Sequence, residues 1–77
     1  MEQYSIITKN NEFSNIAIKG TVIKIEPLSR LVFISSQFMD IVVQHNDKIP
    51  EIGKCYYFMI IQFPDKRVSI INDFILI

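Results

Sequence analysis

NIAIKGTVIKIE, residues 15–26, is the stretch that decides the fold of this chain. Its apolar residues alternate with polar ones up to Val22, as in a half-buried strand, and the alternation then changes parity at Ile23. A change of parity within one strand predicts a β-bulge, and Gly20 just before it permits a close backbone approach or a sharp bend. The stretch therefore predicts a long, bent first strand at the corner of a barrel.

The rest of the chain carries turn residues at strand spacing. Proline, glycine, asparagine and aspartate gather between apolar runs, at residues 27–29, 46–53 and 64–67. Residues 36–38 are predicted to be a further short connection. Four further strands are therefore predicted, over residues 30–36, 39–45, 54–63 and 68–77. We expect residues 1–14 to form an N-terminal arm or a short extra strand at 4–8, and residues 15–77 to form one domain. The predicted fold is all-β, with at most one short helical turn between the third and fourth strands.

Length and composition favour a small barrel with an exposed apolar surface. The chain has 77 residues, of which 49% are hydrophobic, and isoleucine is unusually frequent among them. β-Branched residues favour strands over helices. A domain of this size has one modest core, so apolar side chains this numerous favour a surface that faces a partner.

Charge and cysteine content restrict the possible functions and locations. Eight basic residues balance eight acidic ones, whereas a protein that binds nucleic acid by itself normally needs a basic stripe. Cys55 is the single cysteine, so there is no internal disulfide, which suits a reducing compartment. The N-terminal residues lack the apolar core of a signal peptide, and no apolar run is long enough to span a membrane. We expect an intracellular protein, nuclear or cytoplasmic and not secreted.

The reactive side chains form no catalytic or metal-binding pattern. His45 and Cys55 end and begin neighbouring strands, but nucleophilic catalysis also needs an orienting group and a formed pocket. One histidine, one cysteine and scattered aspartates lack the spacing of a zinc site. Gly20 and Gly53 do not make a phosphate-binding loop. The sequence therefore predicts no enzyme, no metal, no cofactor and no small-molecule substrate.

Aromatic residues beside basic ones are the candidates for nucleic-acid contact. Rings stack on bases in barrels that bind single strands, while lysine and arginine follow the phosphates. The candidates at and near the predicted turns are Lys24, Arg30, Phe33, Phe38, Lys66 and Arg67. A core position for Phe33 and a solvated turn for Lys66 and Arg67 remain alternatives.

The fourth and fifth predicted strands supply the candidates for a partner interface. If Lys54 and Gln62 face water, strand parity exposes Tyr56, Phe58 and Ile60 and places Cys55, Tyr57, Met59, Ile61 and Phe63 in the core. Exposed aromatic side chains dominate binding energy at interfaces, and an unpaired apolar edge strand invites association. The predicted interface comprises Tyr56, Phe58, Ile60, Phe74, Ile75, Leu76 and Ile77.

Two stretches carry a resemblance to a known family. IKGTVIKI, residues 18–25, and IPEIGKCYYF, residues 49–58, resemble the first strand and the fourth-strand entry of the five-stranded oligonucleotide/oligosaccharide-binding Greek-key barrel, the OB fold. Within that superfamily, the pattern is similar to the smallest subunit of replication protein A and to its counterpart in the telomere-capping trimer. Those subunits carry a C-terminal helix, whereas residues 74–77 keep strand character.

The resemblance implies a function through assembly. It implies a non-enzymatic structural subunit of a single-stranded-DNA-binding complex in DNA replication, which acts mainly by protein–protein contacts. Its partners are then larger OB-fold subunits in a heteromer, and single-stranded nucleic acid is reached mainly through the complex. No membrane is implied.

Two alternatives from other classes remain. SQFMDIVV, residues 36–43, is similar to part of the first motif of Sm-type RNA-binding ring proteins, although Asn72 and Asp73 stand roughly where that family has Arg-Gly. One alternative is therefore a small barrel that binds RNA or single-stranded DNA directly, an Sm-like ring included. The other is a protein-interaction module with no nucleic-acid role.

Overall fold

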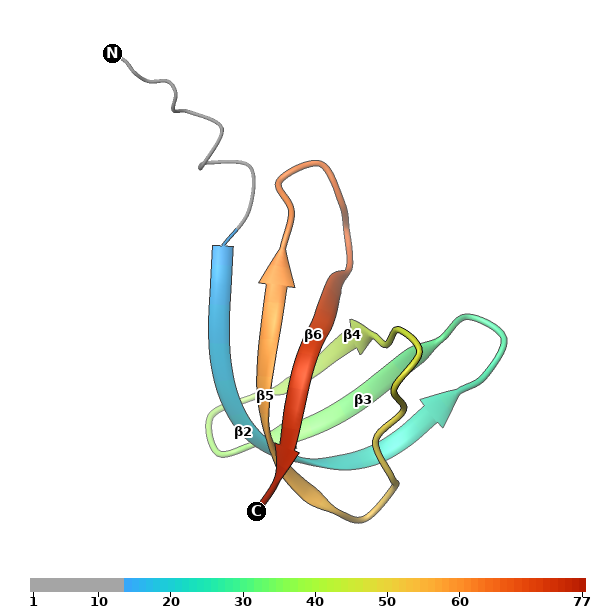
Figure 1. The fold of residues 1–77 in the computed structure, drawn as a ribbon, viewed down its shortest axis with the longest axis vertical. Coiled ribbons are helices and arrows are strands. Elements are labelled where there is room, and N and C mark those ends of the chain that lie inside the picture. Colours follow the sequence, from blue (N-terminus) through green and yellow to red (C-terminus); the bar gives the residue numbers. More distant parts are fainter. Residues whose placement is uncertain (1–13) are drawn as a thin grey trace.

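The computed structural model describes residues 14–77, which form five strands and no helix (Figure 1). The strands are β2 (Ser14–Glu26), β3 (Leu31–Ser36), β4 (Asp40–Gln44), β5 (Cys55–Gln62) and β6 (Ser69–Leu76). They close into a barrel in the order β2-β3-β4-β6-β5. The predicted all-β, five-stranded barrel is confirmed, and each strand end lies within one residue of its predicted place. The arm or extra strand predicted at residues 1–14 falls almost wholly outside the described residues.

β2 belongs to both layers of the barrel because it changes partner along its length. Its first part, residues 14–21, pairs antiparallel with β5, and its second part, residues 20–26, pairs with β3. The pairing with β3 shifts register between Val22 and Lys24, so Ile23 is the extra residue of a bulge. The bulge predicted from the parity change is therefore present at the predicted place.

Gly20 lies at the residue where β2 has both neighbours. It pairs with Ser36 of β3 and with Tyr56 of β5. A Cβ atom at this position would lie 2.5 Å from Cγ2 of Ile34 and 3.0 Å from the carbonyl oxygen of Ser35. Glycine is therefore required for the close approach of β2 and β3, as the sequence predicted.

The core is made by alternate side chains of all five strands. Its buried apolar residues are Val22, Val32, Ile34, Val43, Tyr56, Phe58, Ile60 and Ile71. The rings of Tyr56 and Phe58 lie 5.4 Å apart between centroids, and the ring of Phe74 packs 5.0 Å from that of Tyr56. The Tyr56 hydroxyl accepts a hydrogen bond of 2.9 Å from the backbone N–H of Glu51.

The predicted parity of β5 is wrong. Tyr56, Phe58 and Ile60, predicted to be an exposed row, fill the core, while Tyr57 and Met59, predicted to be core, are exposed. The error came from the polar residues used to set the parity. The side chain of Gln62 has the same inward parity as those of Tyr56, Phe58 and Ile60, but it is exposed to solvent because it lies at an open end of the barrel. Lys54 precedes β5 and does not set the direction of the strand's side chains.

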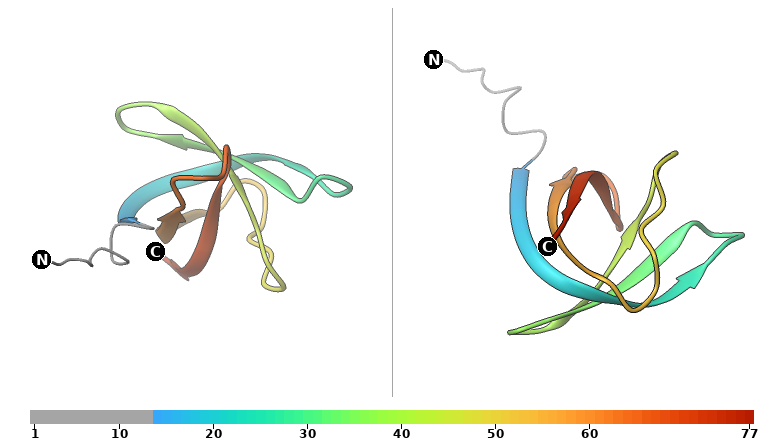
Figure 2. Two further views of the ribbon diagram at one scale, coloured as in Figure 1. Left: turned by 90° about the horizontal axis from the view of Figure 1, so that it is seen from above. Right: turned by 60° about the horizontal axis from the view of Figure 1, so that its bottom comes forward.

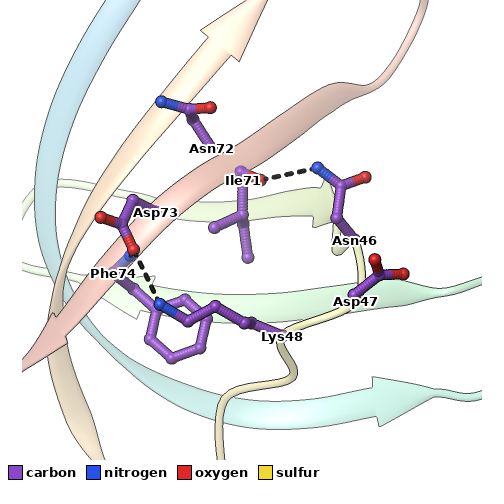
Figure 3. Close-up of a pocket in the computed structure, with 7 residues that line it drawn as sticks. All are labelled: Asn46, Asp47, Lys48, Ile71, Asn72, Asp73 and Phe74. Carbon is purple, nitrogen blue, oxygen red and sulfur yellow. Dashed lines mark hydrogen bonds and ion pairs between the residues drawn. The ribbon is translucent and has the colours of Figure 1, made fainter.

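The long β4–β5 loop, residues 45–54, covers part of the free edge of β6 (Figure 3). The Asn46 side chain donates a hydrogen bond to the carbonyl oxygen of Ile71, and the Lys48 ammonium group lies 3.1 Å from the Asp73 carboxylate. Covering an edge strand in this way makes its free hydrogen-bonding groups inaccessible to other chains.

None of the described residues forms a helix long and apolar enough to cross a membrane.

Candidate functional site at the barrel mouth

One end of the barrel is open, because the strand pair that should close it is very short. β4 and β6 pair in parallel over only two residue pairs, Val43 with Ser69 and Gln44 with Ile70. Figure 1 shows β2, β5 and β6 running side by side to this end, and Figure 2 shows β3 and β4 crossing that layer at an angle. The two layers therefore separate at the end where β2 and β6 begin and β5 ends.

The separation leaves a pocket of about 500 Å³, which we call the mouth. Its apolar lining comes from β2, from β4 with the residue before it, and from β5, namely Ile16, Ile18, Met39, Ile41, Val42, Val43 and Ile60. Its polar lining is Gln62, Arg67 and Ser69. Ile16, Ile18 and Ile41 face inward but are only half-buried, whereas Val22 and Phe58 in the middle of the barrel are fully buried. The mouth thus exposes side chains that the strand pattern directs toward the core.

The rim of the mouth is positively charged. The β5–β6 loop carries Lys66 and Arg67, and both line a second hollow of about 290 Å³ that shares Gln62, Arg67 and Ser69 with the mouth. No aspartate or glutamate of the described residues lines either hollow; Asp65, in the same loop, lines neither. An apolar lining beside basic groups favours a ligand that has an apolar part and a negative charge.

The six candidates for nucleic-acid contact do not form one surface. Lys24 and Phe33 lie together on the outer side of β2 and β3, with the ammonium group 5.1 Å from the ring centroid. Arg30 lies in the β2–β3 turn with a positive φ of 62°. Phe38, which is 87% exposed, lies in the β3–β4 turn. Of the six, only Arg67 lines the mouth, and Lys66 lines the adjoining hollow.

The candidates for a partner interface are divided as well. Ile75, Leu76 and Ile77 are exposed, while Phe74 packs on the ring of Tyr56.

The mouth itself was missed by the sequence interpretation. The available signal was the inward parity of Ile16 and Ile18 in the part of β2 before Gly20, where only β5 is a neighbour.

The reactive groups of the described residues do not converge. His45 is 4% exposed, and its Nδ1 lies 2.6 Å from the carbonyl oxygen of Asn46. Cys55 is half-buried at the start of β5. No group of three or more histidine, cysteine, aspartate and glutamate side chains lies together within residues 14–77.

Asp73 has a structural contact rather than a reactive one. The pKa of its carboxyl group is lowered, first by the hydrogen bond from Lys48 and then by the hydrogen bond from the backbone N–H of Phe74. The same lysine lies over the ring of Phe74, 5.3 Å from its centroid. These contacts hold the β4–β5 loop against β6 (Figure 3).

The fold defines the class of protein: a small, closed, five-stranded β-barrel without helices in the described residues. No known protein family and no curated protein matches the sequence. A solved structure that resembles the barrel is that of CusF with silver(I), residues 10–88, from Escherichia coli. The TM-score is 0.73, with 15% identical residues, and the match covers 88% of this chain and 98% of that chain. A likeness at this identity establishes the shared fold.

This comparison corrects the functional predictions made from the sequence. The resemblance to the smallest subunit of replication protein A and to the telomere-capping subunit is wrong, because the structural comparison identifies a silver-bound bacterial protein instead. The predicted role in a single-stranded-DNA-binding complex and the predicted OB-fold and nucleic-acid partners are wrong with it, and neither alternative is supported. So is the intracellular location, nuclear or cytoplasmic and not secreted. The physical reason is that strand spacing reports the barrel, which proteins of unrelated function share.

Proposed function

We propose that this barrel is a non-enzymatic binding protein whose mouth takes a small amphipathic anion. The apolar part of the ligand lies against Ile16, Ile18 and Ile41, and its acidic group lies at Arg67. The observation that carries the proposal is the half-buried, inward-facing apolar lining directly below a basic rim.

Size and chemistry both support this class of ligand. The mouth, at about 500 Å³, has the volume of an ordinary small-molecule site, and barrel mouths are common places for such sites. Each methylene withdrawn from water contributes about 0.8 kcal/mol, so a chain of eight to ten carbons is long enough for measurable binding. Because association itself costs several kcal/mol and the mouth is open, we expect a dissociation constant on the order of 0.1–1 mM.

The side chains of the mouth favour binding over catalysis. Among the described residues that line it there is no histidine, cysteine, aspartate or glutamate, so a general base for the Ser69 hydroxyl is lacking. Arg67 offers five N–H donors and no acceptor, which suits a bound carboxylate, sulfate or phosphate group.

Silver(I), the ion in the similar structure, does not fit the donor side chains of residues 14–77. Soft cations prefer thiolate, thioether and imidazole ligands. The chain has one cysteine, one histidine and three methionines. Cys55 and Met59 are separated by about 13 Å along β5, at about 3.3 Å per residue, and the ring of His45 is buried inside the barrel. We therefore derive no metal-carrying function from the shared fold.

The proposal is tested with decanoate and its uncharged counterpart decanol. In ¹H–¹⁵N spectra of the full chain at neutral pH, decanoate should shift the amides of Ile16, Ile18 and Ile41 in a saturable manner. Arg67→Gln should weaken decanoate binding about fivefold, which corresponds to about 1 kcal/mol for a partly exposed charge contact, and should leave decanol binding unchanged. Lys24→Gln, which removes a cation on the outer side of β2, is the matched control and should change neither.

Two results would contradict this function. One is a decanoate response that is absent or that falls on residues outside the mouth. The other is equal binding of decanoate and decanol with no effect of Arg67→Gln, which would leave only nonspecific apolar adsorption.

A further inference from the structure

The outer surface of β2, β5 and β6 carries a second feature, on the side of the sheet that faces away from the core. Pairing places Lys19, Tyr57 and Ile75 in one row across the three strands, and Ala17, Met59 and Asp73 in the next row. Ile77 lies beside the start of β5, because its N–H donates a hydrogen bond to the carbonyl oxygen of Cys55. The exposed fractions of the four large apolar side chains are 55% for Tyr57, 44% for Met59, 67% for Ile75 and 55% for Ile77.

We call these four residues, Tyr57, Met59, Ile75 and Ile77, the outer apolar face. Single exposed apolar residues are normal on protein surfaces, but a contiguous group of them marks an interaction site. The core does not use these side chains, because their neighbours along β5, Tyr56, Phe58 and Ile60, already fill the barrel. The mouth does not use them either, since none of the four lines it.

We propose that a second copy of this chain covers the outer apolar face, sheet against sheet. Sheets commonly pack face to face about 10 Å apart, so an apolar sheet face is suitably covered by another sheet layer of the same kind. The chain itself supplies that layer. A two-fold symmetric contact uses the same patch on both copies, so one self-complementary face is sufficient.

The charges at the two flanks of the face support a second copy as the occupant. Lys19 lies on the β2 side and Asp73 on the β6 side. A two-fold axis parallel to β5 places β2 of each copy opposite β6 of the other, which brings Lys19 next to the strand that carries the second copy's Asp73. The Asp73 carboxylate is 54% exposed and has acceptor sites beyond those used by Lys48 and the N–H of Phe74. A partner whose surface had one sign of charge would match only one flank.

The size of the face sets the strength of this contact. Three strands at about 4.8 Å spacing, with about four residues each at about 3.3 Å, give a footprint well below the roughly 800 Å² per partner of a stable interface. We therefore expect a weak dimer that forms with increasing concentration.

The test is the mass of the full chain in solution, measured by sedimentation equilibrium from about 10 µM to about 1 mM. The mass should rise from the 9.0 kDa of one chain toward twice that value. Met59→Lys, at the middle of the face, should weaken the association at least tenfold. Leu28→Lys is the matched control, because Leu28 is 101% exposed in the β2–β3 turn, away from the outer apolar face. Both substitutions replace an exposed apolar side chain with a lysine.

A second variant tests the arrangement of the two copies. Added salt should weaken the wild-type dimer modestly, because Lys19 and Asp73 then attract less. Lys19→Glu should weaken the dimer in low salt and reverse the effect of salt, since the flanks then repel. A mass that stays at one chain at 1 mM would overturn the proposal. So would an association that Met59→Lys and Leu28→Lys affect equally, with circular dichroism confirming that both variants are folded.

Discussion

Replacement of Gly20 by alanine is the sharpest test of how the barrel is built. The new Cβ would lie 2.5 Å from Cγ2 of Ile34, where carbon atoms normally approach to about 3.5–4.0 Å, and 3.0 Å from the carbonyl oxygen of Ser35. Ile34 is fully buried, and the carbonyl group belongs to the backbone of β3. Neither can move by the required ~1 Å without displacing other core atoms.

The expected magnitude combines two opposing effects. Overpacking of this kind costs about 1–3 kcal/mol of unfolding free energy. Alanine also restricts the unfolded chain relative to glycine, which returns about 0.4–1 kcal/mol. The midpoints of these two ranges, about 2 and about 0.7 kcal/mol, give a net loss of about 1.3 kcal/mol for Gly20→Ala. For a domain of this size that corresponds to a fall in melting temperature of roughly 5–10 °C.

Urea unfolding, followed by circular dichroism, measures this loss, and a double-mutant cycle tests its cause. In an Ile34→Ala background the clash with Cγ2 is gone, so Gly20→Ala should cost clearly less. Gly53→Ala is the matched control: Gly53 has φ of 88° and no heavy atom within 4 Å of the added Cβ, so its cost should come from backbone strain alone and be the same in both backgrounds. An unchanged urea midpoint for Gly20→Ala, or the same cost in both backgrounds, would refute the reasoning.

Three further predictions concern other contacts of the barrel. The pKa of Asp73 is held below its ordinary value of 3.8, so its ionised form stabilises the folded state above that pH, and this contribution disappears as the pH falls through the lowered pKa. Lys48→Met should raise the pKa of Asp73 in an NMR titration. An unchanged pKa would contradict the assignment of the shift to Lys48. Tyr56→Phe removes the acceptor for a backbone N–H and should cost about 1–2 kcal/mol in urea unfolding, where a neutral result would mean that water replaces the hydroxyl. Silver(I) should bind only the thiol of Cys55, so native mass spectrometry should show no silver adduct on Cys55→Ser; an adduct that survives there and is lost with Met39→Leu would reveal a thioether site.

Local physics made most of the fold predictable. The change of parity at Ile23 and the glycine at position 20 report one bend in one strand, and both are properties of residues near each other in the sequence. Strand ends followed turn residues closely for the same reason. The direction of the β5 side chains could not be predicted from local sequence. Gln62 is exposed to solvent because it lies at the open end of the barrel, although its side chain has inward parity.

The candidate site depended on contacts that the sequence does not show locally. The mouth exists because β4 and β6 share so few residue pairs, and the length of that pairing is set by how two layers cross. Lys66 and Arg67 were recognised as a basic pair, but their position beside an apolar pocket follows from where the β5–β6 loop lies relative to β2 and β4. The family was misassigned for a related reason, because alternation and turn spacing are common to many barrels.

The partner change along β2 also has a consequence for how the chain is made. Ser14 pairs with Gln62, so the first described strand meets its β5 neighbour only after most of the chain has left the ribosome. Until then β2, β3 and β4 form an antiparallel meander whose two outer edges, on β2 and β4, are open, and pairings between distant segments form slowly. Resistance to proteases should therefore be acquired late in synthesis, in one step, when the last strands emerge and the earliest one receives its second neighbour.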